Sequence, residues 1–156
     1  MNQQQRNWTH FLLCALLILP ILSLLFIDIQ LSSKIDSDLV NDVAGLSVSI
    51  EKHDENGETS IISIEDTETK QLVIDYLRCA FVQYQKSAAQ MPYDVEQYTV
   101  VLDKNGNHEY VCVNDKNGVY LASKGRLYSI TNNVDLHNLM SILFNQIQDE
   151  QGVNLS

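Results

Sequence analysis

Basic residues are scarce in this chain. Its 156 residues include 10 Lys and Arg against 20 Asp and Glu, and Arg6 is the only charged residue before Asp28. The part from Asp28 onward therefore has nine basic and twenty acidic residues, a formal charge of −11. Because binding to nucleic acid depends on Lys and Arg that neutralise phosphates, this composition argues against a nucleic-acid partner. The excess of acids instead favours solubility.

Cysteines are also few, and three of them cannot form a disulfide framework. Cys14 lies in an apolar run, whereas Cys79 is followed by apolar residues in a predicted helix and Cys112 is flanked by apolar residues in a predicted strand. Two interpretations of this pair stay open: two small buried apolar side chains, or a disulfide if that helix packs on that strand. No CxxC motif and no Cys-His spacing typical of a zinc site occurs.

Catalytic motifs are missing as well. The sequence has no GxSxG elbow, P-loop, HExxH or GxGxxG motif. Asp103 to Asn107 begins like a calcium loop, but His108 and Asn114 replace its glycine and its final acid, which favours a hairpin turn. We therefore expect no enzyme activity, no cofactor and no metal. The alternative is an envelope hydrolase or metal-binding protein, if hairpin ends bring His53 and His108 together with an acid.

One long apolar run, Phe11 to Ile27, stands near the N-terminus. With Thr9 and His10 it approaches the roughly 20 residues that a helix needs to span a bilayer. Arg6 precedes the run without any acid, and Trp8 is placed to lie at the interface. The sequence thus predicts a cytoplasmic N-terminus over residues 1–10, a transmembrane signal anchor over 11–27, and an extracytoplasmic C-terminal domain of a single-pass cell-membrane protein.

Two other treatments of this segment stay open. A cleaved signal peptide usually has a shorter apolar region followed by small residues, whereas cleavage after Ser33 would put Leu31 where a small residue is required. A lipoprotein needs a small residue directly before the modified cysteine, but Leu13 precedes Cys14. Both comparisons favour the uncleaved anchor.

The remainder predicts one small domain. Residues 28–44 have apolar side chains at near-helical spacing and are expected to form a juxtamembrane stalk. Leu46 to Ile50 alternates apolar and polar residues, and Asn56-Gly57 turns the chain into a second strand at 61–64. A helix follows from Asp66 or Thr67, with an apolar face that continues to Tyr84.

Four short strands are expected between Val95 and Ile130, joined by Asn-Gly and Lys-Gly turns. A closing helix runs to about Ile147, and residues 148–156 are expected to be a flexible tail. The predicted fold class is therefore α+β: an N-terminal transmembrane helix, then an antiparallel sheet built from a hairpin, a helix, a four-strand meander and a C-terminal helix. The domain spans 45–147, and the helices cover one face.

Three segments carry a resemblance to a known group of proteins. They are DTETKQLVIDYL at Asp66 to Leu77, GRLYSI at Gly125 to Ile130, and LHNLM at Leu136 to Met140. Together they resemble the small uncharacterised extracytoplasmic α+β domains on membrane-anchored proteins and lipoproteins of Gram-positive bacteria. The resemblance covers Gly45 to Ile147 and implies export and an α+β fold, but no activity. The chain departs from the lipoprotein members because it lacks a lipobox.

Tyrosines supply the candidate binding surface. Tyr98, Tyr110, Tyr120 and Tyr128 fall on the predicted strands and could line one face of the sheet, where aromatic side chains bind peptides or glycans. The simpler alternative is that they are core residues. We expect a non-enzymatic interaction or regulatory domain that binds a protein, a peptide or an envelope ligand outside the membrane, for example as an immunity-like protein.

Overall fold

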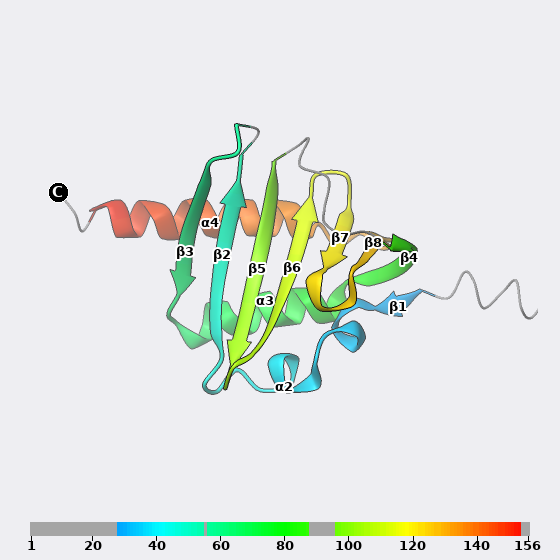
Figure 1. The fold of residues 1–156 in the computed structure, drawn as a ribbon. Helices are drawn as coiled ribbons and strands as arrows, with labels where there is room; N and C mark the ends of the chain where they lie inside the picture. The colour runs from blue at the N-terminus through cyan, green and yellow to red at the C-terminus, as the bar shows by residue number, and fades with distance from the viewer. Residues whose placement is uncertain (1–27, 55, 88–95, 154–156) are drawn as a thin grey trace, which may run out of the picture.

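The domain is built on one eight-stranded sheet. The computed structural model describes residues 28–54, 56–87 and 96–153, and the strands follow the order β1-β4-β8-β7-β6-β5-β2-β3 (Figure 1). Every strand pair in these ranges is antiparallel. The strands are β1 Ile29–Gln30, β2 Ser47–His53, β3 Thr59–Ile64, β4 Phe81–Ser87, β5 Gln97–Lys104, β6 Asn107–Asn114, β7 Gly118–Leu121 and β8 Arg126–Ile130.

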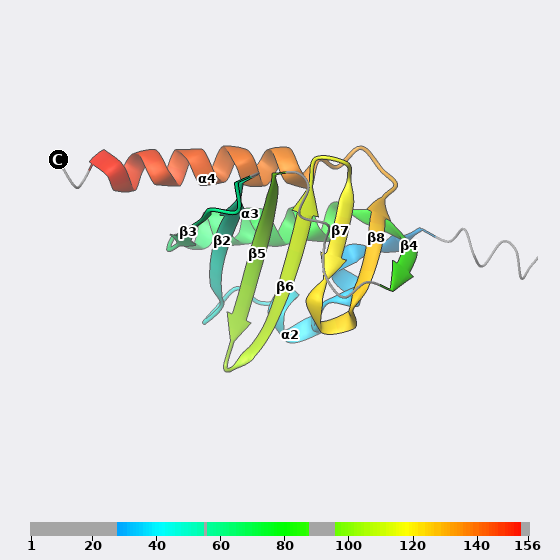
Figure 2. The same cartoon turned by 45° about the horizontal axis from the view of Figure 1, so that its top comes forward.

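Two long helices cover one face of the sheet. They are α3, Thr67–Cys79, and α4, Leu136–Val153, which lie side by side in both views (Figures 1 and 2). Three short helices complete the described chain: η1 Leu31–Lys34, α2 Ser37–Val40 and η2 Ala122–Lys124. We call the side of the sheet under α3 and α4 the helical face, and the other side the open face.

The predicted fold class is wrong. A hairpin and a four-strand meander were expected, whereas the chain forms a single eight-stranded sheet and is mostly sheet. The unexpected strands are β1 and β4, which together form one edge. Within 28–54, 56–87 and 96–153, no helix is long and apolar enough to cross a membrane. The segment predicted to do so, residues 11–27, lies outside the described residues.

Helix α3 ends earlier than its apolar pattern predicted. The helix stops at Cys79, Ala80 is extended at φ −75° and ψ 126°, and Phe81 starts β4. Ala80, Phe81 and Tyr84 fit a helical face, whereas Val82 and Tyr84 fit the alternation of a strand. Because Phe, Val and Tyr favour strands, and because β8 offers a pairing partner, the strand forms.

The segment predicted as a stalk is instead part of the domain. Residues 28–44 form β1, η1 and α2, and their apolar side chains are buried in the same core as α3: Leu31, Ile35, Leu39 and Val40. The Leu31 amide donates to the Ala80 carbonyl at 2.8 Å. The Lys104 ammonium donates to both the carbonyl and the carboxylate of Asp42 at 3.1 Å. The near-helical spacing in this segment therefore reflects packing against the domain.

The hydrophobic core lies between the sheet and its two long helices. Alternate residues of each strand point to the helical face, as in β5, where Val100 and Leu102 are buried opposite Val111 and Glu109 of β6. The helices supply the other half of the core: Val73, Ile74 and Leu77 from α3, and Leu136, Met140, Leu143 and Phe144 from α4. This packing fixes both helices against the sheet, and so fixes the surface that they present outward.

Turns and ends follow local chemistry. Asn105 and Gly106 have φ of 56° and 79°, so the segment compared with a calcium loop is a two-residue hairpin turn.

At the C-terminus α4 continues to Val153. The tail expected over residues 148–156 is therefore helical in its first part.

Candidate docking groove between helices α3 and α4

The four tyrosines predicted to form one surface are divided between the two faces. Tyr98 and Tyr128 are buried on the helical face, where the Tyr98 ring lies 5.1 Å from the His137 ring and 6.0 Å from the Phe144 ring, measured between centroids. Tyr110 and Tyr120 belong to the open face, and Tyr120 is buried there in a small cluster with Leu127 and Cys112. Only Tyr110 of the four is substantially exposed. The structure therefore forms no common tyrosine surface.

The cysteines and histidines that could have built a site are also dispersed. His53 ends β2 and His108 lies at the start of β6, at opposite ends of the sheet. Cys79 and Cys112 are free thiols, and Cys79 is exposed rather than buried. Cys112 points to the open face, opposite Tyr120, and burial raises the pKa of its thiol. Across 28–54, 56–87 and 96–153, no group of three or more His, Cys, Asp or Glu residues could hold a metal ion.

A buried carboxylate, Glu109, has a structural explanation. Its Oε1 accepts hydrogen bonds from the amide of Ser123 at 3.0 Å and from the amide of its own neighbour Tyr110 at 3.2 Å, and its Oε2 accepts from the Ser123 hydroxyl. These donors attach η2 to strand β6. Glu109 thus stabilises a turn between two strands.

A second polar cluster links α4 to the sheet. Glu96 accepts hydrogen bonds at 3.0 Å from the Tyr98 hydroxyl and from the Lys52 ammonium. The His137 Nε2 lies 4.0 Å from the same carboxylate and has no hydrogen-bond partner among the described residues. Burial acts to raise the pKa of Glu96, but hydrogen bonds from Lys52 and Tyr98, with the charges of Lys52 and His137, hold that pKa below its usual value.

Acid should weaken this cluster. A carboxylate whose pKa is lowered by folding stabilises the domain above its unfolded pKa, and the contribution is lost as the pH falls through the lowered folded pKa. Because the Glu96 side chain is 37% exposed, we expect the loss to be only about 0.5–1 kcal/mol after solvent screening. Thermal unfolding between pH 6 and pH 3 should show a smaller acid-dependent decrease in Glu96→Gln than in the parent. Equal decreases in both proteins would contradict this assignment.

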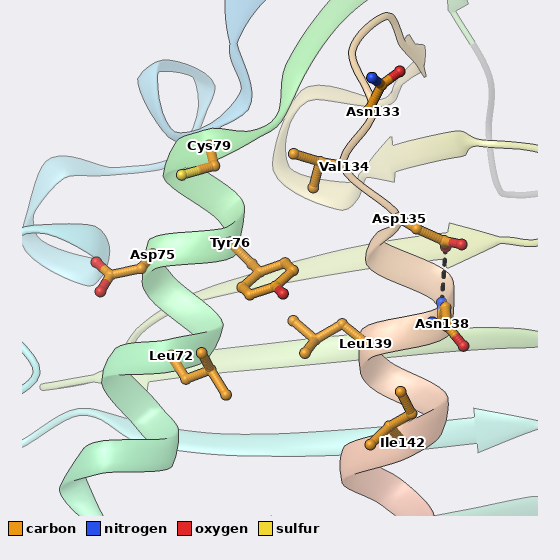
Figure 3. A pocket seen from close by; sticks show the side chains of 10 residues that line it. All are labelled: Leu72, Asp75, Tyr76, Cys79, Asn133, Val134, Asp135, Asn138, Leu139 and Ile142. Carbon is orange, nitrogen blue, oxygen red and sulfur yellow. Dashed lines mark hydrogen bonds between the residues drawn. The ribbon is translucent and has the colours of Figure 1, made fainter.

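The most distinctive surface is a groove between α3 and α4. It has a volume of about 470 Å³, and α3 supplies Leu72 and Tyr76 while α4 supplies Leu139 and Ile142. Figure 3 shows Tyr76 and Leu139 pointing toward each other across the groove, with Val134 near one end. Leu72, Tyr76 and Ile142 remain 40%, 37% and 46% exposed. Large apolar side chains that stay exposed together are typical of a protein-binding surface.

Each helix carries a second apolar stripe beside its buried one. On α3, Val73, Ile74 and Leu77 face the sheet, whereas Leu72 and Tyr76, four residues apart, face the groove. On α4, Leu139 and Ile142 take the corresponding outer positions. The sequence pattern predicted one broad apolar face for α3 and one apolar stripe for α4, so the groove between the two helices was not predicted. The signal was the width of that face, which exceeds what contact with one sheet requires.

Two acidic residues of the lining lie at the outer borders of the groove. Asp75 points to the outer side of α3 and Asp135 to the outer side of α4 (Figure 3). An adjoining hollow of about 480 Å³ shares Leu72 and Asp75 and adds Asp66 and Glu68. Asp75 also forms a 3.1 Å ion pair with Arg78, but the residues that line the two hollows include no Lys, Arg or His.

Asp66 is held in its charged form by the helix that it caps. Its Oδ1 accepts a hydrogen bond from the Thr69 amide at 2.7 Å, and this backbone bond lowers the pKa of the Asp66 carboxyl. The N-terminal end of a helix favours a negative charge for the same reason. The negative charge at the end of α3 near the second hollow therefore persists to a lower pH than that of an ordinary aspartate.

Comparisons with known proteins identify no relative. The chain matches no known family model, no curated protein and no solved structure. The resemblance to extracytoplasmic domains of Gram-positive bacteria thus stays a prediction.

Proposed function

We propose that the chain is a membrane-anchored, extracytoplasmic, non-enzymatic interaction domain, and that its groove between α3 and α4 binds a cationic amphipathic helix of a partner protein. The observation that carries the proposal is the exposed apolar lining from two packed helices, with four acids and no basic residue in the lining of the groove and its adjoining hollow. An amphipathic helix that lies in an apolar groove is a recurring mode of recognition.

The charges favour a basic partner. The acids of the two hollows would meet Lys or Arg on the polar side of a bound helix, and the formal charge of −11 after Ile27 would attract such a partner from a distance. Burying the exposed parts of Leu72, Tyr76 and Ile142 is the main source of binding energy. Because association and side-chain ordering have large entropic costs, we expect a dissociation constant on the order of micromolar.

Peptide binding to the full chain in nanodiscs of zwitterionic lipid tests the proposal. The probe is an 18-residue helical peptide of leucine and lysine with one apolar face, and empty nanodiscs supply the baseline. We expect saturable binding that Leu72→Glu combined with Ile142→Glu weakens by about tenfold or more, since a change of 1.4 kcal/mol is tenfold. Both positions are already exposed, so the double variant should fold.

Two controls make the result specific. Ile61→Glu alters another exposed apolar residue on β3, outside the groove, and should leave binding unchanged. A peptide with glutamate in place of lysine should bind at least several-fold more weakly. Equal binding by the parent and the Leu72/Ile142 double variant would overturn the groove as the site.

A further inference from the structure

Sheet edge β1–β4 stands directly at the end of the predicted membrane segment. That segment ends at Ile27, and Asp28 alone separates it from β1, which begins at Ile29. A fully extended chain advances by at most about 3.6 Å per residue, so Ile29 can lie no more than about 7 Å from the end of the span. Without an intervening stalk, this edge of the sheet has to adjoin the bilayer.

The edge differs in charge from the rest of the domain. Strands β1, β4 and β8 contain none of the chain's twenty acidic residues, but they contain Lys86 and Arg126. These two cations lie on neighbouring strands, because Arg126 pairs with Ser87 in the β4–β8 ladder. Apart from Asp28, which directly precedes β1, this edge of a strongly acidic domain is therefore basic, and it is the edge that the predicted membrane segment enters.

Exposed apolar and aromatic side chains accompany the cations. Ile29 and Phe81 are each more than one-third exposed, and Tyr84 is 52% exposed. The Arg126 guanidinium lies 5.7 Å from the centre of the Tyr84 ring, and that ring makes an edge contact with Tyr128. Tyrosine with an adjacent cation suits the headgroup region, where the ring lies among apolar groups and the charge meets phosphate.

We propose that the β1–β4 edge rests on the outer leaflet, with Ile29, Phe81 and Tyr84 in the headgroup region and with Lys86 and Arg126 facing lipid phosphates. The inference rests on the membrane anchoring in the proposed function. The occupant is the bilayer itself, because the chain enters the edge from the predicted span and because the edge has the positive charge that anionic lipid attracts. The sheet then stands upright, with β3 at the far end.

Quenching by brominated lipid tests this contact. The full chain carries Trp8→Phe, which removes its single Trp, together with Tyr84→Trp, and is placed in nanodiscs that contain phosphatidylglycerol. Lipids brominated in the acyl chain near the headgroup should lower the tryptophan emission of this Tyr84→Trp variant by about twofold or more if the side chain lies in the interface. Phe81→Trp serves as a second reporter if Tyr84→Trp lowers stability.

Ile61→Trp is the matched control. It places the reporter on β3, at the other end of the eight-stranded order, which is about 34 Å from β1 for strands about 4.8 Å apart. Its emission should not respond to brominated lipid.

Co-purification with the discs reports the anchoring separately. A chain that leaves the discs overturns both proposals. A chain that stays in the discs while neither the Tyr84→Trp nor the Phe81→Trp variant is quenched overturns only the edge contact. The edge contact alone is likewise overturned if the emission of the Tyr84→Trp variant changes when the chain self-associates but does not change with brominated lipid.

Discussion

A fragment that begins at Gly45 will not fold cooperatively, whereas one that begins at Asp28 will. The shorter fragment lacks β1, η1 and α2, and with them the buried side chains of Leu31, Ile35, Leu39 and Val40. Full burial of such a side chain is worth about 1.5–3 kcal/mol, so four of them contribute about 6–12 kcal/mol. That is comparable to the whole stability of a typical domain, about 5–15 kcal/mol.

The same segment also holds the domain through polar groups. The Arg78 guanidinium donates to the Val40 carbonyl, and the Lys104 ammonium donates to Asp42. Urea unfolding followed by circular dichroism measures the difference in the free energy of unfolding between the Gly45 and Asp28 fragments. In the full chain, Leu31→Ala should cost about 2–5 kcal/mol, whereas Ser33→Ala, at an exposed position, should cost less than about 1 kcal/mol. If the Gly45 fragment were as stable as the Asp28 fragment, residues 28–44 would be a stalk outside the folded domain, as the sequence predicted.

Tyr98→Ala should be among the most damaging single substitutions in the domain. The ring is completely buried between the sheet and α4, against Phe144 and His137, and its hydroxyl donates to Glu96. Removing a buried aromatic ring and leaving a cavity costs about 3–5 kcal/mol. The loss should appear as a lower urea midpoint without a change of the m-value.

Smaller changes separate the contributions of the ring and of the hydroxyl. Tyr98→Phe keeps the ring and removes the hydrogen bond to Glu96, which should cost about 1–1.5 kcal/mol. Tyr110→Ala, on the open face and partly exposed, should cost about 1 kcal/mol or less. If Tyr98→Ala left stability unchanged and instead abolished peptide capture, Tyr98 would be a binding residue as the sequence first suggested.

The sequence located strands where the pattern is local. Alternating residues in β2 and β5, and the Asn-Gly turns beside them, act within a few positions of one another, so they are visible in sequence alone. Strands β1 and β4 are different. The pairing of Ile29 with Val82 joins residues 53 positions apart, and β1 has only two residues, too few to show any alternation. The fold class was wrong because this edge is defined by distant partners.

The length of one hairpin turn determines that Tyr98 and Tyr110 lie on different faces of the sheet. The two-residue turn at Asn105 and Gly106 pairs Lys104 with Asn107, which places Tyr98 opposite Val113 and Tyr110 opposite Val101. Directly paired residues share a face and successive residues alternate, so Tyr98 and Tyr110 must lie on different faces. The sequence contained the Asn-Gly signal for this turn, but the prediction of a common surface did not use its register.

The groove required information that the sequence does not contain. The breadth of the apolar faces on α3 and α4 could have indicated a second contact for each helix. Tyr76 and Leu139 point toward each other because of the spacing and direction of α3 and α4. In the sequence these two helices are separated by strands β4 to β8. Only the packed structure decides whether such surplus apolar residues cover each other or stay accessible.

The strand order also constrains when the domain can be completed during export. In the proposed topology β1 leaves the membrane first, but its partner β4 follows about fifty residues later, and β4 in turn pairs with β8 at Arg126–Ile130. The edge nearest to the membrane therefore cannot close until almost the whole chain has been translocated. Until then Leu31 and its neighbours remain uncovered, and such distant pairings form slowly. In that topology the order of synthesis would leave the protein dependent, for that interval, on factors that protect unfolded chains outside the membrane.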